Sequence, residues 1–304
     1  MVMKKALKLL WTLPLAALLF ACEGAEPELP VFTPPEDGGG DQEKPELSLE
    51  PAECNNRVVA HRCGAKEAGL PDNSLAALEY AMRLGCYAAE IDIYYTSDNN
   101  VIVHHGSSGK VNGLFPSQHT LEQIRAAGKL SNGEEIPTLE DFLDAVCVKG
   151  NCTRLWIETK NITNEELLPS AQEAAIINGV KRSLEIIAEK KAEKFVEFNG
   201  TGRSAVFKQI YPLIKAKGYS CSMATANSAA TMKSNGYEWS NYDVTSKSAS
   251  DIAGIVADYQ QYSVSLSLYN IDTDELRSAC SPHKEKVKGL MTNYPRALMG
   301  AINW

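Results

Sequence analysis

The chain has 304 residues, of which 44% are hydrophobic, and a net charge of −8 from 30 Lys and Arg against 38 Asp and Glu. This length allows one large domain with a full core, and the acidic balance excludes the global basic field that attracts nucleic acid. Residues 1–22 contribute +3 and residues 23–53 contribute −9, so residues 54–304 carry only −2.

The first 22 residues read as an export signal. Three lysines within the first eight residues precede an apolar run, residues 9–21, that is too short to span a bilayer comfortably. The run ends in Leu19-Phe20-Ala21-Cys22, which resembles the lipobox of bacterial lipoproteins, where the cysteine is lipidated and becomes the mature N-terminus. We therefore expect an exported protein, anchored in the bacterial cell envelope through a lipidated Cys22 on the periplasmic or the cell-surface side. A plain secretory signal cut nearby is the alternative.

Residues 23–53 are rich in Pro, Gly and acidic groups. Such a segment buries too little apolar surface to offset the entropy of ordering it, so a disordered acidic tether is predicted. The folded domain is then expected to cover residues 54–304.

Seven cysteines remain beyond Cys22, at positions 54, 63, 86, 147, 152, 221 and 280. In an exported protein some of them are expected to pair, and spacing favours a bridge between Cys147 and Cys152. The odd number leaves at least one thiol free. The spacings form no zinc pattern, and most of these cysteines sit in apolar surroundings, so buried thiols are the default interpretation.

Strand and helix patterns alternate along the domain. Eight strands are predicted, at residues 57–61, 89–95, 154–159, 195–198, 219–223, 237–244, 264–269 and 288–292. Helices are expected between them, at residues 74–84, 139–146, 165–190, 204–217, 229–234, 250–262 and 272–279, with a last one after Pro295. This alternation predicts a (β/α)8 TIM barrel. An open doubly wound sheet is the alternative, but no Gly-rich phosphate loop follows the first strand.

The stretch from Ala88 to His105 reads as two short strands joined by the polar turn 97–100, a small hairpin insertion after the second barrel strand. Glu90 and Asp92 are two residues apart, so both carboxylates project from one face of the strand. Carboxylates in this arrangement hold a hard divalent cation, and a histidine beside them transfers protons. A solvated edge hairpin is the alternative.

The active site of a TIM barrel lies at the carboxyl ends of its strands, which predicts where polar residues should gather. The first predicted strand ends in His61-Arg62, the third carries Glu158 and Lys160, and the last ends in Thr292-Asn293. Together with the carboxylates and histidines of the hairpin, these residues are expected to converge on one rim. The alternative is that these residues are unrelated polar groups of the core. Each side chain would then need its own hydrogen-bonding partner there.

Stretches in this order resemble the motifs of the glycerophosphodiester phosphodiesterase family. They are His61-Arg62-Cys63-Gly64 with Pro71-Asp72-Asn73-Ser74, similar to HRG and PENT; Glu90-Ile91-Asp92 with the strand to His104, similar to E-x-D and its following H-D; Ile136 to Leu143, similar to the "iPTLeEvL" helix start; Ile157-Glu158-Thr159-Lys160, similar to I-E-x-K; and Gly289 to Pro295, similar to the closing "G-i-i-T-D-y-P". The resemblance covers essentially all of residues 57–300 and implies a metal-dependent phosphodiesterase on a (β/α)8 barrel.

The resemblance also implies the ligands of one divalent cation, commonly Ca²⁺ or Mg²⁺. Glu90, Asp92 and Glu158 match the metal-binding carboxylates of the family. Asp72 matches the position of a further ligand, which is Glu in the family.

The same carry-over gives roles to the basic residues. His61 and His104 match the two histidines that act as general base and acid, and Arg62 and Lys160 match positions near the phosphate. Their chemistry is coherent, because cationic groups stabilise the charge of a phosphodiester while two histidines move the protons.

Several residues depart from the family pattern. Cys63 stands where glycine is usual, Asp72 replaces Glu, and His105 and Asn293 each replace an aspartate. The metal carboxylates and both histidines are retained, so catalysis is expected to persist, while the altered residues line the substrate side.

The expected activity is hydrolysis of a glycerophosphodiester, or a related small phosphodiester, to an alcohol and glycerol phosphate. No nucleic acid partner is expected, and the oligomeric state is open. Two alternatives stay open as well: a phospholipase- or sphingomyelinase D-like enzyme that forms a cyclic phosphate, and a catalytically impaired barrel that binds a phosphorylated ligand at the cell surface.

Overall fold

The computed structural model describes residues 45–160, 166–224 and 227–304. The predicted export signal, Cys22 and the predicted tether as far as residue 44 lie outside the described residues. Residues 45–53, which the sequence assigns to the tether, belong to the folded unit that begins at Pro45. No helix in the described ranges is long and apolar enough to cross a bilayer.

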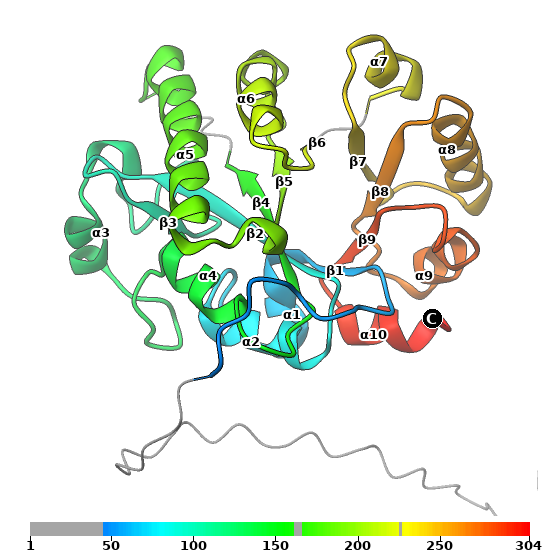
Figure 1. Ribbon diagram of the computed structural model, residues 1–304, viewed down its shortest axis with the longest axis horizontal. Helices are drawn as coiled ribbons and strands as arrows, with labels where there is room; N and C mark the ends of the chain where they lie inside the picture. Colours follow the sequence, from blue (N-terminus) through cyan, green and yellow to red (C-terminus); the bar gives the residue numbers. More distant parts are fainter. Residues whose placement is uncertain (1–44, 161–165, 225–226) are drawn as a thin grey trace, which may run out of the picture. The chain divides into compact units, whose positions relative to one another are not determined.

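Eight parallel strands form the wall of a barrel (Figure 1). They are β1 (Val58–Ala60), β2 (Ala88–Tyr95), β4 (Arg154–Thr159), β5 (Val196–Gly200), β6 (Ser222–Met223), β7 (Trp239–Asp243), β8 (Ser265–Tyr269) and β9 (Gly289–Thr292). Their order is β5-β4-β2-β1-β9-β8-β7-β6, and a parallel bridge between Phe198 and Cys221 joins the two ends of that order. The ring is nearly closed, and the predicted (β/α)8 barrel is confirmed.

Helices connect the strands and surround the ring (Figure 1). They are α1 (Ala65–Ala68), α2 (Leu75–Arg83), α3 (Leu121–Ala127), α4 (Leu139–Val146), α5 (Pro169–Lys190), α6 (Ser204–Ala216), α7 (Ala229–Ser234), α8 (Ala249–Gln261), α9 (Asp274–Cys280) and α10 (Pro295–Ala301). Side chains fix several starts as the sequence predicts: the Ser74 hydroxyl accepts from the Ala77 N–H, and Thr138 and Asp141 form a capping box.

The segment after β2 is larger than the small hairpin that the sequence predicts. β3 (Val101–Val103) pairs antiparallel with β2, as expected. The chain then makes an excursion up to α4 that contains the short η2 (Pro116–Gln118) and α3, neither of which is predicted. This excursion has its own apolar core, with Phe115 and Ile124 among its buried members. α3 was missed because it is only one to two turns long, although a capping box marks its start at Thr120.

The barrel interior is filled at one level and polar at the next. Trp156 and Trp239 stack within it, with ring centroids 4.8 Å apart. A Cβ on Gly289 would lie 2.5 Å from the Trp156 ring, so only glycine fits there. On β2, Ala89, Ile91 and Ile93 pack outward in the main core, and Ala88, Glu90 and Asp92 turn into the barrel. The tryptophan layer closes the interior below the polar residues and leaves them at the carboxyl ends of the strands.

The bridge predicted between Cys147 and Cys152 is absent, because all the described cysteines are free. Cys147 ends α4 as its C-cap and is buried. The Cys152 thiol turns away and donates to the Gly85 carbonyl at 3.6 Å. The disulfide predicted from the short spacing is therefore wrong, because the helix end and the loop direct the two cysteine side chains to different neighbours.

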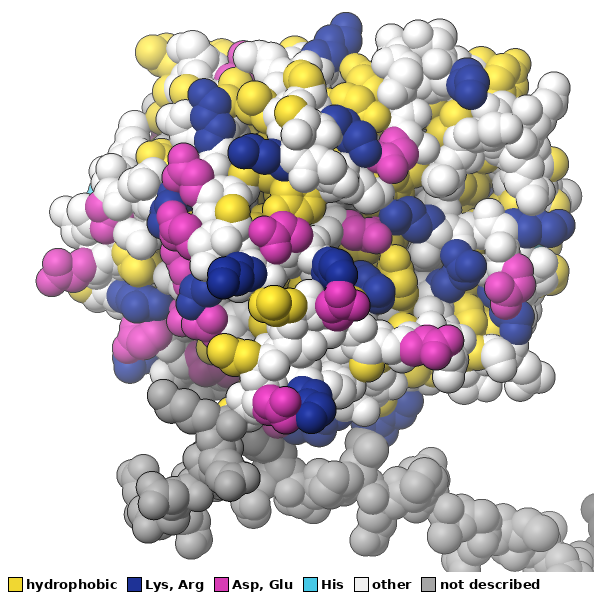
Figure 2. Space-filling view, in the orientation of Figure 1, with side chains coloured by type: hydrophobic (Ala, Val, Ile, Leu, Met, Phe, Trp, Pro, Cys, Tyr) yellow, Lys and Arg dark blue, Asp and Glu magenta, His cyan; other side chains and the backbone are white. Residues whose placement is uncertain are grey.

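Charged side chains are intermixed on the face shown in Figure 2. Ion pairs across short distances also occur within the domain; Arg182 on α5, for example, lies 3.0 Å from Glu185 and 3.0 Å from Glu189. On the face shown, basic and acidic side chains are interspersed and do not form separate acidic and basic regions.

Candidate active site

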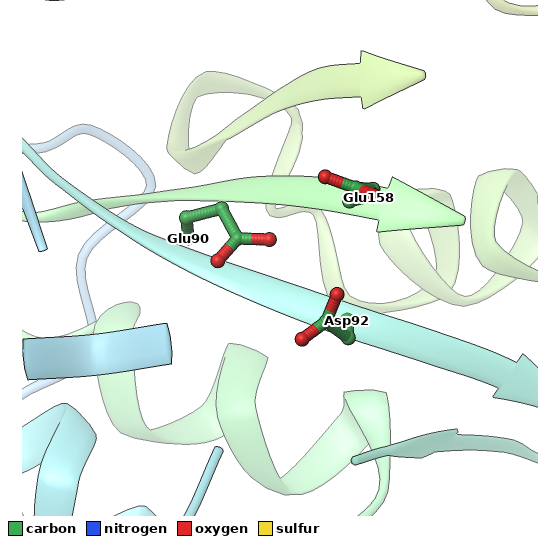
Figure 3. Close-up of side chains that lie close together, drawn as sticks. All are labelled: Glu90, Asp92 and Glu158. Atoms are coloured by element: carbon green, nitrogen blue, oxygen red, sulfur yellow. The ribbon is translucent and has the colours of Figure 1, made fainter. Parts of the chain in front are cut away.

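Three carboxylates from two neighbouring strands face one another inside the barrel (Figure 3). Glu90 and Asp92 lie on β2 and Glu158 lies on β4, and Asp92 and Glu158 are direct register partners. One oxygen from each lies within 4.8 Å of the others. The period-two spacing of β2 and the alignment of parallel strands produce this cluster, as the sequence predicts.

Burying these carboxylates together lowers the stability of the fold unless a positive charge lies beside them. Glu90 and Asp92 are each only 1% exposed. Burial, with the charge of neighbouring carboxylates, raises the pKa of Glu90 well above its ordinary range, and burial raises the pKa of Glu158 to about 7. Glu90 Oε2 accepts from the Arg62 backbone N–H at 3.0 Å, but the buried Glu90 Oε1 has no hydrogen-bond partner. Crowded carboxylate oxygens with one unsatisfied atom fit a hard divalent cation.

Lys160 partly neutralises the cluster. Its Nζ lies 2.9 Å from Asp92 Oδ1 and 4.0 Å from Glu158 Oε1. Asn73 donates to Asp92 Oδ2 at 2.9 Å, and its own Oδ1 accepts from the Asp92 N–H. Burial alone would raise the pKa of Asp92, but Lys160 and the other polar neighbours outweigh it and the pKa is lowered. Asp92 is therefore the ionised member of the cluster.

Asp72 lies outside the carboxylate cluster. It accepts from Arg62 Nη1 at 2.8 Å, and its side chain is 41% exposed. A glutamate would reach one methylene further, whereas this aspartate is held by the arginine. The sequence predicts Asp72 as a further metal ligand; the structure places it outside the three-carboxylate cluster, in an ion pair with Arg62.

The loop after β1 has an unusual backbone. In η1 (His61–Gly64), Arg62 and Cys63 have φ angles of 47° and 65°, in the left-handed region that favours glycine. This turn aims the Arg62 N–H at Glu90, and the Cys63 thiol contacts the Glu90 carbonyl at 3.8 Å. This left-handed backbone conformation explains why glycine is usual at position 63 in the family pattern. The buried Cys63 adopts the same conformation with some strain.

His61 presents a free lone pair. Its Nδ1–H donates to Asn293 Oδ1 at 2.9 Å, and the Asn293 amide is fixed because its Nδ2 donates to Asp272 Oδ2 at 2.7 Å. The proton is therefore on Nδ1, and Nε2, which lies 3.9 Å from Glu90 Oε2, is unprotonated. Burial lowers the pKa of His61 to about 4, so the ring is neutral at pH 7. This arrangement suits a general base.

His104 has the complementary arrangement. It follows β3, and its Nδ1 accepts from the Gly106 N–H at 2.7 Å. The neutral ring therefore carries its proton on Nε2, which makes it a donor. Burial lowers the pKa of His104, and the Gly106 N–H acts in the same direction. The two predicted histidines thus differ in tautomer, one accepting and one donating at Nε2.

A pocket of about 360 Å³ opens beside His104. It is lined by Pro71, Asp72, His104, His105, Gly106, Lys129, Leu130 and Ser131. His105 is fixed there by two contacts, because its ring Nδ1 donates to the Gly106 carbonyl and its own carbonyl accepts from the Tyr94 hydroxyl. The departure at His105 therefore does lie at the wall of a pocket next to a predicted catalytic residue.

Residues that sequence reasoning missed hold the predicted ones in place. Asn199 on β5 donates to Glu158 Oε2 at 3.1 Å. Asp272 accepts from the side chain of Asn293, and Asn73 donates to the side chain of Asp92. Asn199 and Asp272 lie at or just beyond the carboxyl ends of their strands, and Asn73 lies in the motif that follows η1. The sequence signal that could have identified Asn199 and Asp272 is a polar residue at or just beyond the carboxyl end of a predicted strand.

Comparisons with known proteins agree on one family. A model of the "Glycerophosphoryl diester phosphodiesterase family" matches residues 61–297. A glycerophosphodiester phosphodiesterase of Caldanaerobacter subterraneus is 34% identical over 98 residues, which are 29% of this chain and 40% of that protein. Glycerophosphodiester phosphodiesterase 1 of Homo sapiens is 32% identical over 112 residues, 32% of this chain and 31% of that protein. The aligned stretches thus span less than half the length of these relatives.

Solved structures agree on the fold. A glycerophosphodiester phosphodiesterase from Parabacteroides distasonis superposes with a TM-score of 0.65 at 22% identity, over 82% of this chain and 97% of the other. A phosphodiesterase from Oleispira antarctica, in complex with the product sn-glycerol-3-phosphate, superposes with a TM-score of 0.58 at 17% identity, over 81% of this chain and 96% of the other. At these identities the likeness establishes the shared barrel.

Proposed function

The chain belongs to the glycerophosphoryl diester phosphodiesterase family, and on that premise we propose that it hydrolyses a glycerophosphodiester to an alcohol and glycerol phosphate. One observation carries the proposal: an acceptor histidine, His61, lies beside a buried carboxylate cluster that has an unsatisfied oxygen. The donor histidine, His104, follows the strand that pairs with β2. These are the groups that phosphodiester hydrolysis requires.

The proposed cofactor is one divalent cation, Ca²⁺ or Mg²⁺, held by Glu90, Asp92 and Glu158. When bound, it supplies positive charge that neutralises and orients the phosphate. Glu90 Oε1 has no hydrogen-bond partner, and the pKa values of Glu90 and Glu158 are raised. Both observations support this assignment, because a bound cation would supply the positive charge that these carboxylates lack.

The proton transfers follow from the two tautomers. His61 Nε2 takes a proton from water, whose oxygen forms the new bond to phosphorus. The bond from phosphorus to the alcohol oxygen breaks, and that oxygen takes a proton from Nε2 of His104. For this step His104 must first gain a proton on Nδ1, which breaks its hydrogen bond with the Gly106 N–H; the negative charge of a bound phosphodiester favours this imidazolium form.

Arg62 and Lys160 are proposed to donate charge-assisted hydrogen bonds to the non-bridging phosphate oxygens. Asp72 and Asp92 hold these two side chains at the site before substrate arrives. Preorganised donors of this kind stabilise the charge that builds up in the transition state.

The pocket beside His104 is the proposed place of the leaving alcohol. Its polar wall, with Asp72, Lys129 and Ser131, suits a small polar alcohol. His105 stands there in place of the family aspartate, so it is expected to influence which alcohol is accepted.

We further propose that the enzyme is exported and anchored through a lipidated Cys22. The basic start, the short apolar run and the lipobox-like Leu19-Phe20-Ala21-Cys22 support this. Its substrates would then be small phosphodiesters present in the cell envelope or outside the cell.

Phosphorus NMR of the purified full chain tests the reaction. With a glycerophosphodiester carrying a choline or ethanolamine head group, Ca²⁺ or Mg²⁺, and water enriched in ¹⁸O, we expect glycerol phosphate with one ¹⁸O on phosphorus. An accumulating cyclic phosphate without ¹⁸O would show that the reaction is intramolecular transfer and not hydrolysis. Saturable binding without any product, over a panel of head groups, would contradict the enzymatic function.

A further inference from the structure

Three cysteines gather at the end of the barrel opposite the active site. Cys54 precedes β1, Cys86 precedes β2 and Cys152 precedes β4 by a few residues each. β4, β2 and β1 are neighbours in the sheet and run parallel, so the residues before them lie together at the amino end of the barrel. The active site uses the carboxyl ends of the same strands.

Backbone hydrogen bonds bring the first segment of the domain to this place. The Ser48 N–H donates to the Cys147 carbonyl at 3.0 Å, and the Ala52 N–H donates to the Asn151 carbonyl at 2.8 Å. Cys152 follows Asn151 directly along the chain, and Cys54 follows Ala52 with only Glu53 between them. The two cysteines, which are distant in sequence, therefore lie side by side.

Their thiols share an acceptor. Cys54 Sγ and Cys152 Sγ each donate to the Gly85 carbonyl, both at 3.6 Å, so the two sulfur atoms lie on either side of one oxygen atom. Both residues are partly exposed, whereas Cys86 is fully buried. Among the cysteines that the structure describes, only this pair combines a shared acceptor with access for a reagent.

We propose that Cys54 and Cys152 form a disulfide bond that fastens the start of the domain to the amino end of the barrel. It replaces the Cys147–Cys152 bridge that spacing favours. The bond lies at the opposite end from the carboxylate cluster, so it stabilises the fold and leaves the chemistry unchanged.

The oxidant is a small-molecule or protein disulfide, and the reaction is thiol–disulfide exchange. The Cys152 thiolate attacks one sulfur of the oxidant and expels one thiolate. The Cys54 thiolate then attacks Cys152 Sγ of this mixed disulfide and expels the second. One disulfide is reduced to two thiols, one new Sγ–Sγ bond forms, and the two cysteine protons pass to the expelled thiolates. Cys152 suits the first attack, because the neighbouring Cys54 thiol lowers its pKa to about 7 and Cys152 is partly exposed.

The test is differential alkylation of the full chain, equilibrated in oxidised or reduced glutathione and mapped by mass spectrometry. We expect oxidation to protect Cys54 and Cys152 from alkylation together and to yield a peptide pair joined through these residues. The melting temperature should rise by roughly 5–10 °C, and dithiothreitol should reverse both effects. Activity at 25 °C should be the same in both forms.

Matched variants separate this pair from its rivals. Cys54→Ser and Cys152→Ser should each abolish the joined peptide and the rise in melting temperature, while Cys147→Ser should retain both. A joined peptide linking Cys152 to Cys147 or Cys86, or full alkylation of Cys54 and Cys152 in oxidised glutathione, would overturn the proposal. Because the peptide map of the unmodified sequence decides this alone, a variant that fails to fold does not weaken the test.

Discussion

The two halves of the barrel interior are polar in different ways. On the β5 to β8 side, neutral groups satisfy one another: Ser222 Oγ donates to Asn199 Oδ1 at 2.6 Å, and Ser267 Oγ donates to Asn241 Oδ1 at 2.9 Å. On the β2 and β4 side, carboxylates crowd together and Glu90 Oε1 has no partner. The Ser–Asn pairs of the neutral half satisfy each other and stabilise the fold, whereas the charged half costs stability until a cation and a phosphodiester complete it.

The largest difference between the halves is expected in catalysis. His61→Ala and His104→Ala should each lower kcat by roughly 10²–10⁴-fold, because each removes one proton transfer. Steady-state kinetics on a glycerophosphodiester, with thermal melts beside them, measure this. His119→Ala is the matched control, since His119 donates to the Phe115 carbonyl in the excursion after β3 and should keep normal kcat. Retained activity in either site variant would remove that histidine from the mechanism.

The cost of the charged half predicts a stabilising substitution. The folded-state pKa of Glu158 is raised to about 7, above the value near 4.5 of an unfolded chain, chiefly by burial. Stability without metal should therefore fall as pH rises from about 4.5 to 7, since the folded state holds the proton more tightly. At pH 7, Glu158→Gln should stabilise the metal-free protein by about 1–3 kcal/mol.

Thermal unfolding in EDTA and in Ca²⁺ measures this trade-off. The unmodified protein should gain melting temperature when Ca²⁺ is added, and Glu158→Gln should gain little. A metal-free variant less stable than the unmodified protein would contradict the account of a costly carboxylate cluster.

Cation binding should depend on pH for the same reason. A ligand carboxylate must lose its proton to bind, so below the pKa of Glu158, about 7, affinity should fall by at least roughly tenfold for each pH unit, and the raised pKa of Glu90 makes the fall steeper. Calorimetric titration of Ca²⁺ or Mg²⁺ between pH 5 and pH 8 measures it, with proton release detected in buffers of different ionisation enthalpy. An affinity that stays constant across this range would exclude Glu158 as a ligand.

The neutral half should respond in stability and hardly in catalysis. Ser267→Ala leaves the buried Asn241 Oδ1 without the hydroxyl that donates to it, which should cost about 1–2 kcal/mol. Denaturant unfolding measures the loss, and kcat should stay within about twofold. Ser265→Ala, at the exposed first residue of the same strand, is the control and should change neither. A large loss of kcat in Ser267→Ala would show that the neutral half takes part in the chemistry.

The same contrast explains what the sequence predicts well. The strand–helix alternation predicts the barrel, and the period of two in β2 predicts that Glu90 and Asp92 share a face. Both are local patterns, and the parallel register then brings Glu158 beside them.

Long-range partners were beyond local patterns. Asn199 contacts Glu158 because β5 pairs with β4, and Asp272 contacts Asn293 because β8 pairs with β9. The neighbourhood of Cys54 and Cys152 depends on the first segment packing beside the loop after α4, a contact that no spacing rule contains. The excursion after β3 was underestimated because its apolar core is assembled from short segments.

The most direct test of the central claim is metal removal from the purified full chain during turnover of a glycerophosphodiester. We predict that EDTA abolishes product formation, that Ca²⁺ or Mg²⁺ restores it, and that Glu90→Gln is not restored at the same cation concentration. Full turnover in the presence of EDTA, or normal turnover by Glu90→Gln, would contradict the assignment of the carboxylate cluster as the cation site on which hydrolysis depends.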